Sequence, residues 1–143
     1  MAETDLGKIV ESYWKFDQLL FDWLKNKTGS TFTFTQFITL HFLKTRGPQA
    51  LKHIAYYLSI TPASTSTMIK KMKKEGFISV MESPADKRIH LIQITPGGQK
   101  RLNSILELME EFFEKFIPKN QRQAYLNIIT SALDNKKTNS KTI

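Results

Sequence analysis

Residues 51–98 read LKHIAYYLSITPASTSTMIKKMKKEGFISVMESPADKRIHLIQITPGG, and this stretch decides the fold. Apolar residues at helical spacing predict a short helix over residues 51–58. Three residues later, Thr61 and Pro62 mark the start of a second helix, because threonine caps a helix and proline fits its first turn. Gly76 is expected to end that helix. Two helices of these lengths, joined by three residues, predict a helix-turn-helix.

A hairpin is expected directly after this pair of helices. Residues 77–81 and 89–94 are apolar and rich in β-branched side chains, and the run between them, from Glu82 to Lys87, is polar. Such a pattern predicts two strands with a polar tip. The pattern leaves open which side of the second strand faces inward. A helix-turn-helix followed by a hairpin predicts a winged helix over about residues 34–95.

Amphipathic helices are expected on both sides of the winged helix. Apolar residues recur at helical spacing over residues 6–24, and Thr33 with Gln36 has the spacing of a capping box. A long helix is expected from Pro96 to residue 117, and a last one after Pro118. The predicted fold class is therefore mainly α with a small β wing, in one domain, since 143 residues are too few for two ordinary ones.

Positive charge is concentrated in the middle of the chain. Eleven of the 21 Lys and Arg residues lie within 44–101, but only three of the 13 Asp and Glu residues, so this segment accounts for the whole formal net charge of +8. Such asymmetry favours a surface that meets a polyanion, with nucleic acid as the first candidate.

Composition excludes several kinds of site. The chain has no cysteine, which rules out disulfides, thiolate metal sites and thiol chemistry and fits a reducing cytosol. The chain lacks an apolar run near the ~20 residues of a membrane span, and its first five residues are unlike a signal peptide. A cytoplasmic protein without a membrane partner is expected.

The helix after Pro62 has two different faces. Its core side is predicted to hold Thr65, Met68, Ile69 and Met72, which share one side at 100° per residue. Small and hydroxyl-bearing residues near its start suit close approach to bases, and the lysines further on suit phosphates. The predicted DNA contacts are Ala63, Ser64, Ser66, Thr67, Lys70, Lys71 and Lys74, with Lys87 and Arg88 at the hairpin tip. The other interpretation of such lysines is an ordinary solvated face.

The order of elements and one motif resemble a known family. The run Gly76-Phe77-Ile78, then Ser83-Pro84-Ala85-Asp86-Lys87-Arg88, then Ile94-Thr95-Pro96-Gly97-Gly98 is similar to the signature of the MarR family of winged helix-turn-helix regulators. The resemblance spans nearly the whole chain. It implies that Arg88 enters a minor groove and that Asp86 holds its guanidinium in place.

Four positions depart from the family pattern. Val80 and Met81 stand where arginines often follow the glycine, and Thr67 stands where many members have an arginine. Lys87 replaces the first arginine of the usual pair, which keeps the charge but loses a bidentate fork. Readout is therefore expected to depend more on hydroxyl contacts, thymine methyls or DNA shape.

The resemblance also implies a function and a domain layout. It implies a homodimer joined through helices over about residues 4–27 and 96–135, with a polar tail over 136–143 that is expected to fray. It implies a DNA-binding transcriptional regulator that binds a near-palindromic operator, and a repressor is favoured over an activator. A small apolar or aromatic effector that releases the protein from the DNA is also expected. The alternative is a winged-helix module that binds RNA or an acidic protein partner without an operator.

Other candidate sites have less support. A ligand pocket between the dimerisation helices and the winged helix would be lined by Tyr13, Phe37, His41 and Tyr56. Neither a metal site nor a cofactor is expected, because His41, His53 and His90 are scattered over three elements. An enzyme is not expected either, because no catalytic set is recognisable. Gly97 and Gly98 are interpreted as local turn chemistry.

Overall fold

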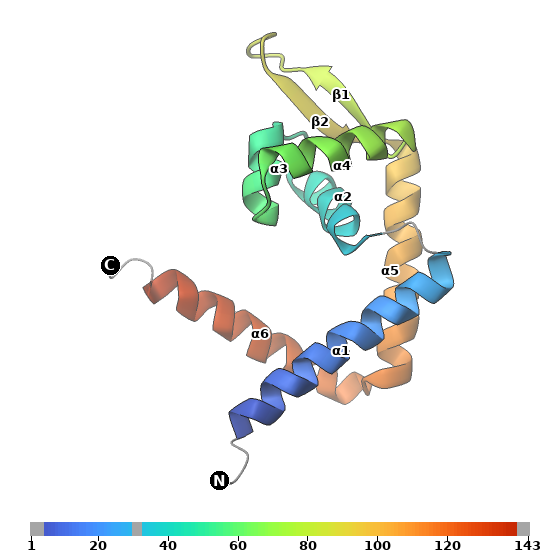
Figure 1. Cartoon of the computed structure of the whole chain (residues 1–143), viewed down its shortest axis with the longest axis vertical. Coiled ribbons are helices and arrows are strands. Elements are labelled where there is room, and N and C mark those ends of the chain that lie inside the picture. The colour runs from blue at the N-terminus through green and yellow to red at the C-terminus, as the bar shows by residue number, and fades with distance from the viewer. Residues whose placement is uncertain (1–4, 30–32, 140–143) are drawn as a thin grey trace. The chain divides into compact units, whose positions relative to one another are not determined.

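The computed structural model describes residues 5–29 and 33–139, which form six helices and two strands. The helices and strands run in the order α1 (Asp5–Thr28), α2 (Phe34–Arg46), α3 (Leu51–Leu58), α4 (Pro62–Lys74), β1 (Ile78–Glu82), β2 (His90–Ile94), α5 (Pro96–Phe116) and α6 (Lys119–Asn139) (Figure 1). This order confirms the predicted fold class, mainly α with a small β wing. The chain divides into two compact units, residues 1–108 and 109–143, with the boundary inside α5.

Threonine side chains begin three of the helices. Thr33 Oγ1 accepts a hydrogen bond from the N–H of Gln36 at 3.3 Å, and Thr61 Oγ1 accepts one from Ser64 at 3.1 Å. Thr95 Oγ1 does the same for Gly98 at 3.0 Å. Each bond satisfies a backbone donor that has no partner inside the helix. The helix starts predicted from Thr33 and Thr61, and the one predicted at Pro96, are confirmed.

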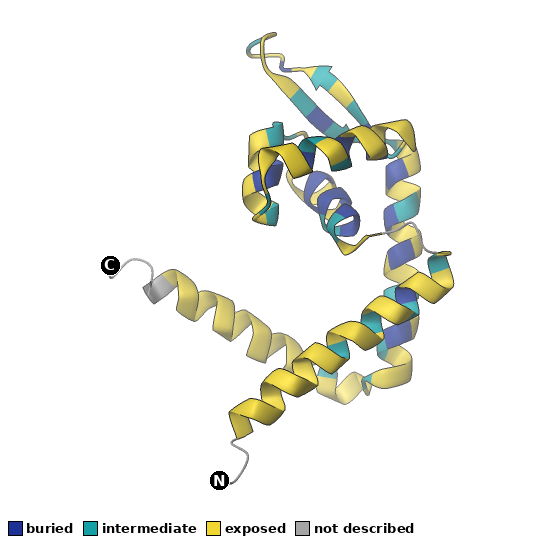
Figure 2. Cartoon of the chain, viewed as in Figure 1, coloured by how far each residue is buried: buried dark blue, intermediate teal, exposed yellow. Residues whose placement is uncertain are grey.

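The core of the first unit surrounds α2. Figure 2 shows buried residues along α2 and on the inward faces of the neighbouring elements. The buried apolar side chains of the winged helix and the first part of α5 are Phe37, Leu40, Phe42, Leu43, Ile54, Ala55, Ile69, Met72, Ile78, Ile92, Leu102 and Ile105. Burial of this continuous apolar set is the main force that holds α3, α4 and the base of the wing in place.

The wing is an antiparallel hairpin with a short third partner. Ile78 pairs with Ile94 and Val80 with Ile92. Gln49 pairs with Ile92 through two backbone hydrogen bonds of 2.8 and 2.9 Å, so the loop before α3 covers the outer edge of β2 at this point. Ile92 is buried and Leu91 half-buried, which settles the inward side of the second strand. The hairpin extends away from the helices (Figure 1).

The base of the wing is fixed to α5 by a close backbone approach. The hydroxyl of Thr95 donates to the Gly76 carbonyl at 2.6 Å, and its N–H donates to the Phe77 carbonyl at 3.1 Å. A Cβ atom on Gly98 would lie 2.0 Å from the Phe77 carbonyl oxygen and 2.8 Å from Ile94 Cγ1. Only glycine fits there, so the interpretation of Gly98 as mere local turn chemistry was wrong.

The first helix is only partly covered by its own unit. The indole N–H of Trp23 donates to the Leu108 carbonyl at 3.1 Å, and Leu24 is buried. Nearer the start of α1, the large apolar side chains are exposed, and they are Leu6, Ile9, Val10, Tyr13 and Trp14. An apolar stripe of this length on a helix surface calls for a covering partner.

The second unit contains the end of α5 and α6. Arg122 and Glu110 form an ion pair at 3.4 Å, and Phe112 contacts Phe113 and Phe116 at ring distances of 5.7 and 4.9 Å. Every described side chain of α6 is exposed except that of Arg122, and the exposed ones include an apolar stripe of Tyr125, Ile128, Ile129, Ala132 and Leu133.

The helical end of α6 differs from the expectation. The polar tail was predicted to begin at residue 136 and fray, but α6 continues to Asn139. Lys137 forms an ion pair with Asp134 at 3.8 Å on this last stretch. Such a pair one turn apart supports a polar helix. The last four residues of the predicted tail, 140–143, lie outside the described residues.

Candidate nucleic-acid interface

The two faces of α4 are as the sequence predicted. Thr65, Ile69 and Met72 are buried and Met68 is half-buried. The Thr65 hydroxyl, which has no solvent exposure, donates to the Thr61 carbonyl at 2.9 Å, so burial leaves it satisfied. The core side of α4 is therefore confirmed, and it fixes which side chains the helix turns outward.

The outward face of α4 carries most of the predicted contacts. Six of the seven predicted residues of this helix are exposed and Ser66 is half-buried; the exposed ones are Ala63, Ser64, Thr67, Lys70, Lys71 and Lys74. Ala63, Thr67, Lys70 and Lys74 share one stripe, because they recur at three- and four-residue spacing. Lys73 is also exposed, a residue that the sequence prediction left out.

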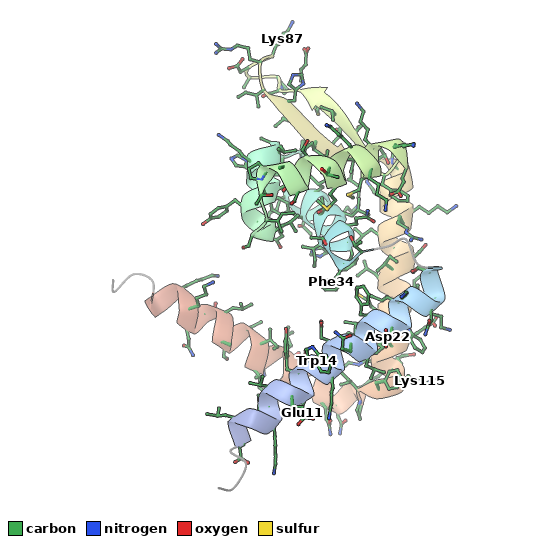
Figure 3. The ribbon with its side chains drawn as sticks, viewed as in Figure 1. Glu11, Trp14, Asp22, Phe34, Lys87 and Lys115 are labelled. Atoms are coloured by element: carbon green, nitrogen blue, oxygen red, sulfur yellow. The ribbon has the colours of Figure 1, made fainter. Side chains whose placement is uncertain are left out.

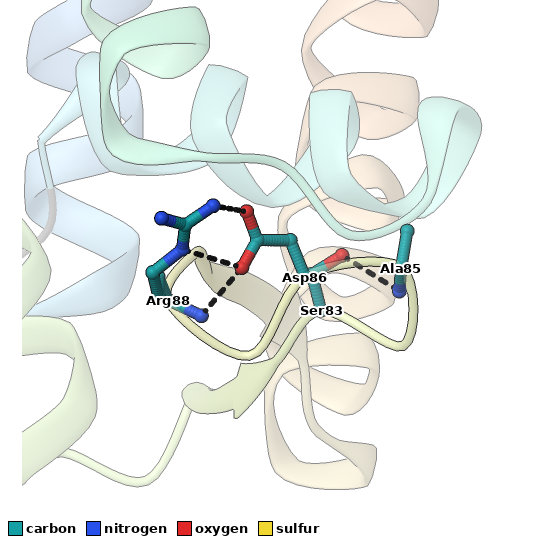
Figure 4. Close-up of polar contacts among 4 residues, drawn as sticks. All are labelled: Ser83, Ala85, Asp86 and Arg88. Carbon is teal, nitrogen blue, oxygen red and sulfur yellow. Dashed lines mark hydrogen bonds and ion pairs between the residues drawn. The ribbon is translucent and has the colours of Figure 1, made fainter.

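An ion pair orders the tip of the wing. The guanidinium of Arg88 donates twice to the Asp86 carboxylate, from Nε to Oδ1 at 3.1 Å and from Nη2 to Oδ2 at 3.0 Å (Figure 4). The backbone N–H of Arg88 also donates to Oδ1 at 3.0 Å. Asp86 thus holds the Arg88 guanidinium, as the resemblance implied. The arginine side chain itself remains 90% exposed.

The ion pair changes the titration of both groups. The side-chain and backbone hydrogen bonds from Arg88 lower the pKa of Asp86 below its ordinary value. The bond to Asp86 raises the pKa of Arg88 in turn. Because both groups are in solvent, this pair adds little to stability. Its main consequence is geometric, since one long side chain is held in a defined direction at low entropy cost.

The rest of the tip is a compact turn. Ser83 Oγ accepts from the N–H of Ala85 at 3.3 Å, and the Ser83 N–H donates to the Ile89 carbonyl at 2.8 Å. Lys87 lies at the end of the hairpin with its side chain directed away from it (Figure 3). The tip therefore presents two cations, Lys87 and Arg88, on a turn closed by its own hydrogen bonds.

The predicted ligand-pocket residues differ in exposure, and none of them lines the hollow beside α1. Phe37 is buried and stacks on His41, with ring centroids 6.2 Å apart, whereas Tyr56 on α3 is 89% exposed. Tyr13 is exposed on α1. A hollow of about 230 Å³ lies instead against α1 and the start of α2, lined by Asp17, Leu20, Phe21, Leu24 and Phe34. Leu20, Phe21 and Leu24 carried no sequence signal beyond belonging to an apolar stripe, and Asp17 and Phe34 carried none.

The histidines lie on three different elements, α2, α3 and β2. Over residues 5–29 and 33–139, no group of three or more His, Asp and Glu side chains is placed to hold a metal ion. In the same part of the chain, none of the helices is both long and apolar enough to span a membrane.

The winged helix matches a protein-family model. Residues 32–90 match the model described as the MarR family. The uncharacterized HTH-type transcriptional regulator YkoM of Bacillus subtilis is 34% identical over 71 residues, a match that covers 50% of this chain and 46% of that protein. The chain thus spans about half the length of this relative.

Solved structures share the whole fold. RV1404 from Mycobacterium tuberculosis superposes with a TM-score of 0.74 at 20% identity, covering 95% of this chain and 97% of that one. BpsR from Bordetella bronchiseptica, whose DNA binding is regulated by 6-hydroxynicotinic acid, superposes with a TM-score of 0.71 at 20% identity, covering 88% and 93%. At this level of identity, the likeness concerns the fold.

Proposed function

We propose, from the premise that this chain belongs to the MarR family, that it is a homodimeric regulator of transcription that binds duplex DNA. In this proposal α4 enters the major groove and the wing tip contacts the adjacent minor groove. The recognition helices of the two copies would lie one duplex turn apart, roughly 34–36 Å, on a near-palindromic operator. Repression is the proposed mode of action, because it is simpler than activation for a protein that occupies such an operator.

One observation carries the proposal. The exposed stripe of α4 begins with small residues and continues with Lys70 and Lys74, while its opposite face is fully used by the core. Arg88 adds a cation that is already held in one direction. A recognition helix needs this combination, because base edges require close approach and phosphates require reach and charge.

Exposed apolar stripes support the homodimer. On α1 the stripe runs from Leu6 to Trp14, and on α6 Ile128 is 69% and Leu133 57% exposed. Burying such side chains contributes about 25 cal/mol per Å² of apolar surface. A second copy of the chain is the proposed cover, since a two-fold operator needs two winged helices.

A small-molecule effector belongs to the proposal by analogy. The DNA binding of BpsR is regulated by 6-hydroxynicotinic acid, and the hollow beside α1 offers four apolar side chains and the carboxylate of Asp17. The hollow measures about 230 Å³, which suits a one-ring compound. Pockets for drug-sized ligands are larger, at ~300–1,000 Å³. Asp17 would disfavour an anionic ligand there. Thermal-shift screening with neutral and anionic one-ring compounds tests this, and stabilisation by anions alone would contradict it.

The main proposal is tested by competition between nucleic acids. A fluorescent duplex selected from genomic fragments is bound to the protein, and unlabelled duplex or an RNA hairpin of equal length is added. The expected result is displacement by the duplex at far lower concentration than by RNA. Equal displacement by both would favour the RNA-binding alternative and contradict an operator.

Charge-matched variants locate the binding surface. Lys70→Ala with Lys74→Ala removes two charges from the exposed stripe of α4, and Lys8→Ala with Lys25→Ala removes two from α1. All four side chains are exposed, so both variants should fold. The first is expected to weaken duplex binding much more than the second. Equal weakening would mean that only net charge matters.

A further inference from the structure

Apart from its lysines, the recognition helix lacks the side chains that read bases with two hydrogen bonds. Its sequence is PASTSTMIKKMKK, which contains no Arg, Asn, Gln, Asp or Glu. Those residue types make most of the paired contacts to guanine, adenine and cytosine in the major groove. The lysines occupy only the second half of the helix, from Lys70 onward. In the proposed function, this half of the exposed stripe contacts phosphates.

The first half of the stripe presents methyl groups. Ala63 and Thr67 are exposed and one turn apart, so their Cβ atoms are neighbours at roughly 5–6 Å. The hydroxyl of Thr67 donates to the Ala63 carbonyl at 3.2 Å, and its hydrogen is therefore already used by the helix backbone. What Thr67 offers outward is its γ-methyl group, beside the β-methyl group of Ala63.

The other fully exposed hydroxyl on this turn, that of Ser64, discriminates poorly between bases. Ser64 Oγ accepts from the Thr61 hydroxyl at 3.0 Å, which leaves its own hydrogen free to donate. A hydroxyl donor can meet guanine or thymine acceptors in the major groove alike. Sequence preference at the start of α4 must therefore come from its apolar contacts.

Thymine is the only base that presents an apolar group, its C5 methyl, in the major groove. We infer that Ala63 and Thr67 contact thymine methyl groups, so that each half-site has A·T pairs opposite the first turns of α4. This inference rests on the proposed function and names the bases that the recognition helix selects. Thr67 is the specificity-determining residue, at the position where many family members have an arginine.

Deoxyuridine tests the contact, because it differs from thymidine only by that methyl group. Duplexes selected from a random pool define the half-site, and each of its thymines is then replaced singly by deoxyuridine. At one or two positions the affinity is expected to fall about fourfold, the effect of one methyl-sized group leaving an apolar contact. The inference is overturned if no thymine in the half-site shows this loss.

Two variants of one residue provide the matched control. Thr67→Ser removes the γ-methyl and keeps the hydroxyl, so sensitivity to deoxyuridine should disappear at one position. Thr67→Val keeps a methyl group there and loses the hydroxyl, so the sensitivity should remain. If Thr67→Ser leaves every sensitivity unchanged, the inference is overturned while DNA binding stands. If no duplex is selected at all, the proposed function itself fails.

Discussion

Adding one methyl group at Gly98 is expected to separate the base of the wing from α5. In Gly98→Ala, the new Cβ would lie 2.0 Å from the Phe77 carbonyl oxygen and 2.8 Å from Ile94 Cγ1. The first neighbour is backbone and cannot rotate away. Relief requires β1 to move from the start of α5, which stretches the 3.1 Å bond between the Thr95 N–H and that same carbonyl.

The size of the effect follows from three terms. Forcing an extra methyl group into a packed site costs about 1–3 kcal/mol. Weakening one or two of the backbone and hydroxyl bonds around Thr95 adds about 1 kcal/mol each. Alanine favours a helix over glycine by about 1 kcal/mol, which opposes the loss. The expected net loss is therefore about 1–4 kcal/mol in the free energy of unfolding, or roughly 3–15 °C in Tm for a chain of this size.

Thermal and urea unfolding measure this loss, and the neighbouring glycine supplies the control. In Gly97→Ala the Cβ would lie 3.2 Å from the Gly76 carbonyl oxygen and 3.7 Å from Thr95 Oγ1, which small shifts can accommodate. This variant should remain within about 1 kcal/mol of the parent protein. Equal stability of the two variants would refute the reasoning that a close backbone approach fixes the wing.

Four further perturbations have defined outcomes. Asp86 should titrate below its ordinary pKa near 4, because Arg88 stabilises its carboxylate. The interaction is therefore complete above pH 4 and is lost as the pH falls through the lowered pKa of Asp86. In an NMR titration, Arg88→Ala should raise that pKa, and an unchanged pKa would contradict the prediction. Arg88→Ala should also weaken duplex binding by about 1–3 kcal/mol without changing Tm, and an unchanged affinity would remove the wing from the interface. Thr61→Ala should cost about 1 kcal/mol in unfolding free energy through the lost cap, whereas no change would mean that the cap contributes nothing. Ile128→Asp should convert a dimer to monomers in sedimentation with the fold intact, while Tyr56→Asp, a control on α3 that is even more exposed, should not. A dimer surviving Ile128→Asp would exclude α6 from the interface.

Local chemistry explains why so much of the fold was predictable. Thr33, Thr61 and Thr95 each cap a helix through their own hydroxyl, and such bonds depend on residues within three positions. The core side of α4 followed from helical periodicity alone. The Asp86–Arg88 pair spans two residues, and the resemblance to a family pointed to it before any geometry was known.

Contacts between distant residues explain what the sequence missed. Gly98 is required because Phe77, far away in the chain, brings its carbonyl to the start of α5. The hollow beside α1 could not be predicted for the same reason, since helical spacing says which residues share a face but not which faces meet. In α6, ion pairing between Lys137 and Asp134 supports a polar helix beyond the last apolar residue of its stripe.

The dependence of duplex affinity on salt tests the central claim, that the lysines of the α4 stripe bind the phosphates of duplex DNA. The logarithm of the association constant should fall linearly with the logarithm of salt concentration, with a slope of about −0.9 for each phosphate neutralised. Lys70→Ala with Lys74→Ala should make that slope shallower by about 2. A flat response in the parent protein, or an unchanged slope in the double variant, would contradict the claim.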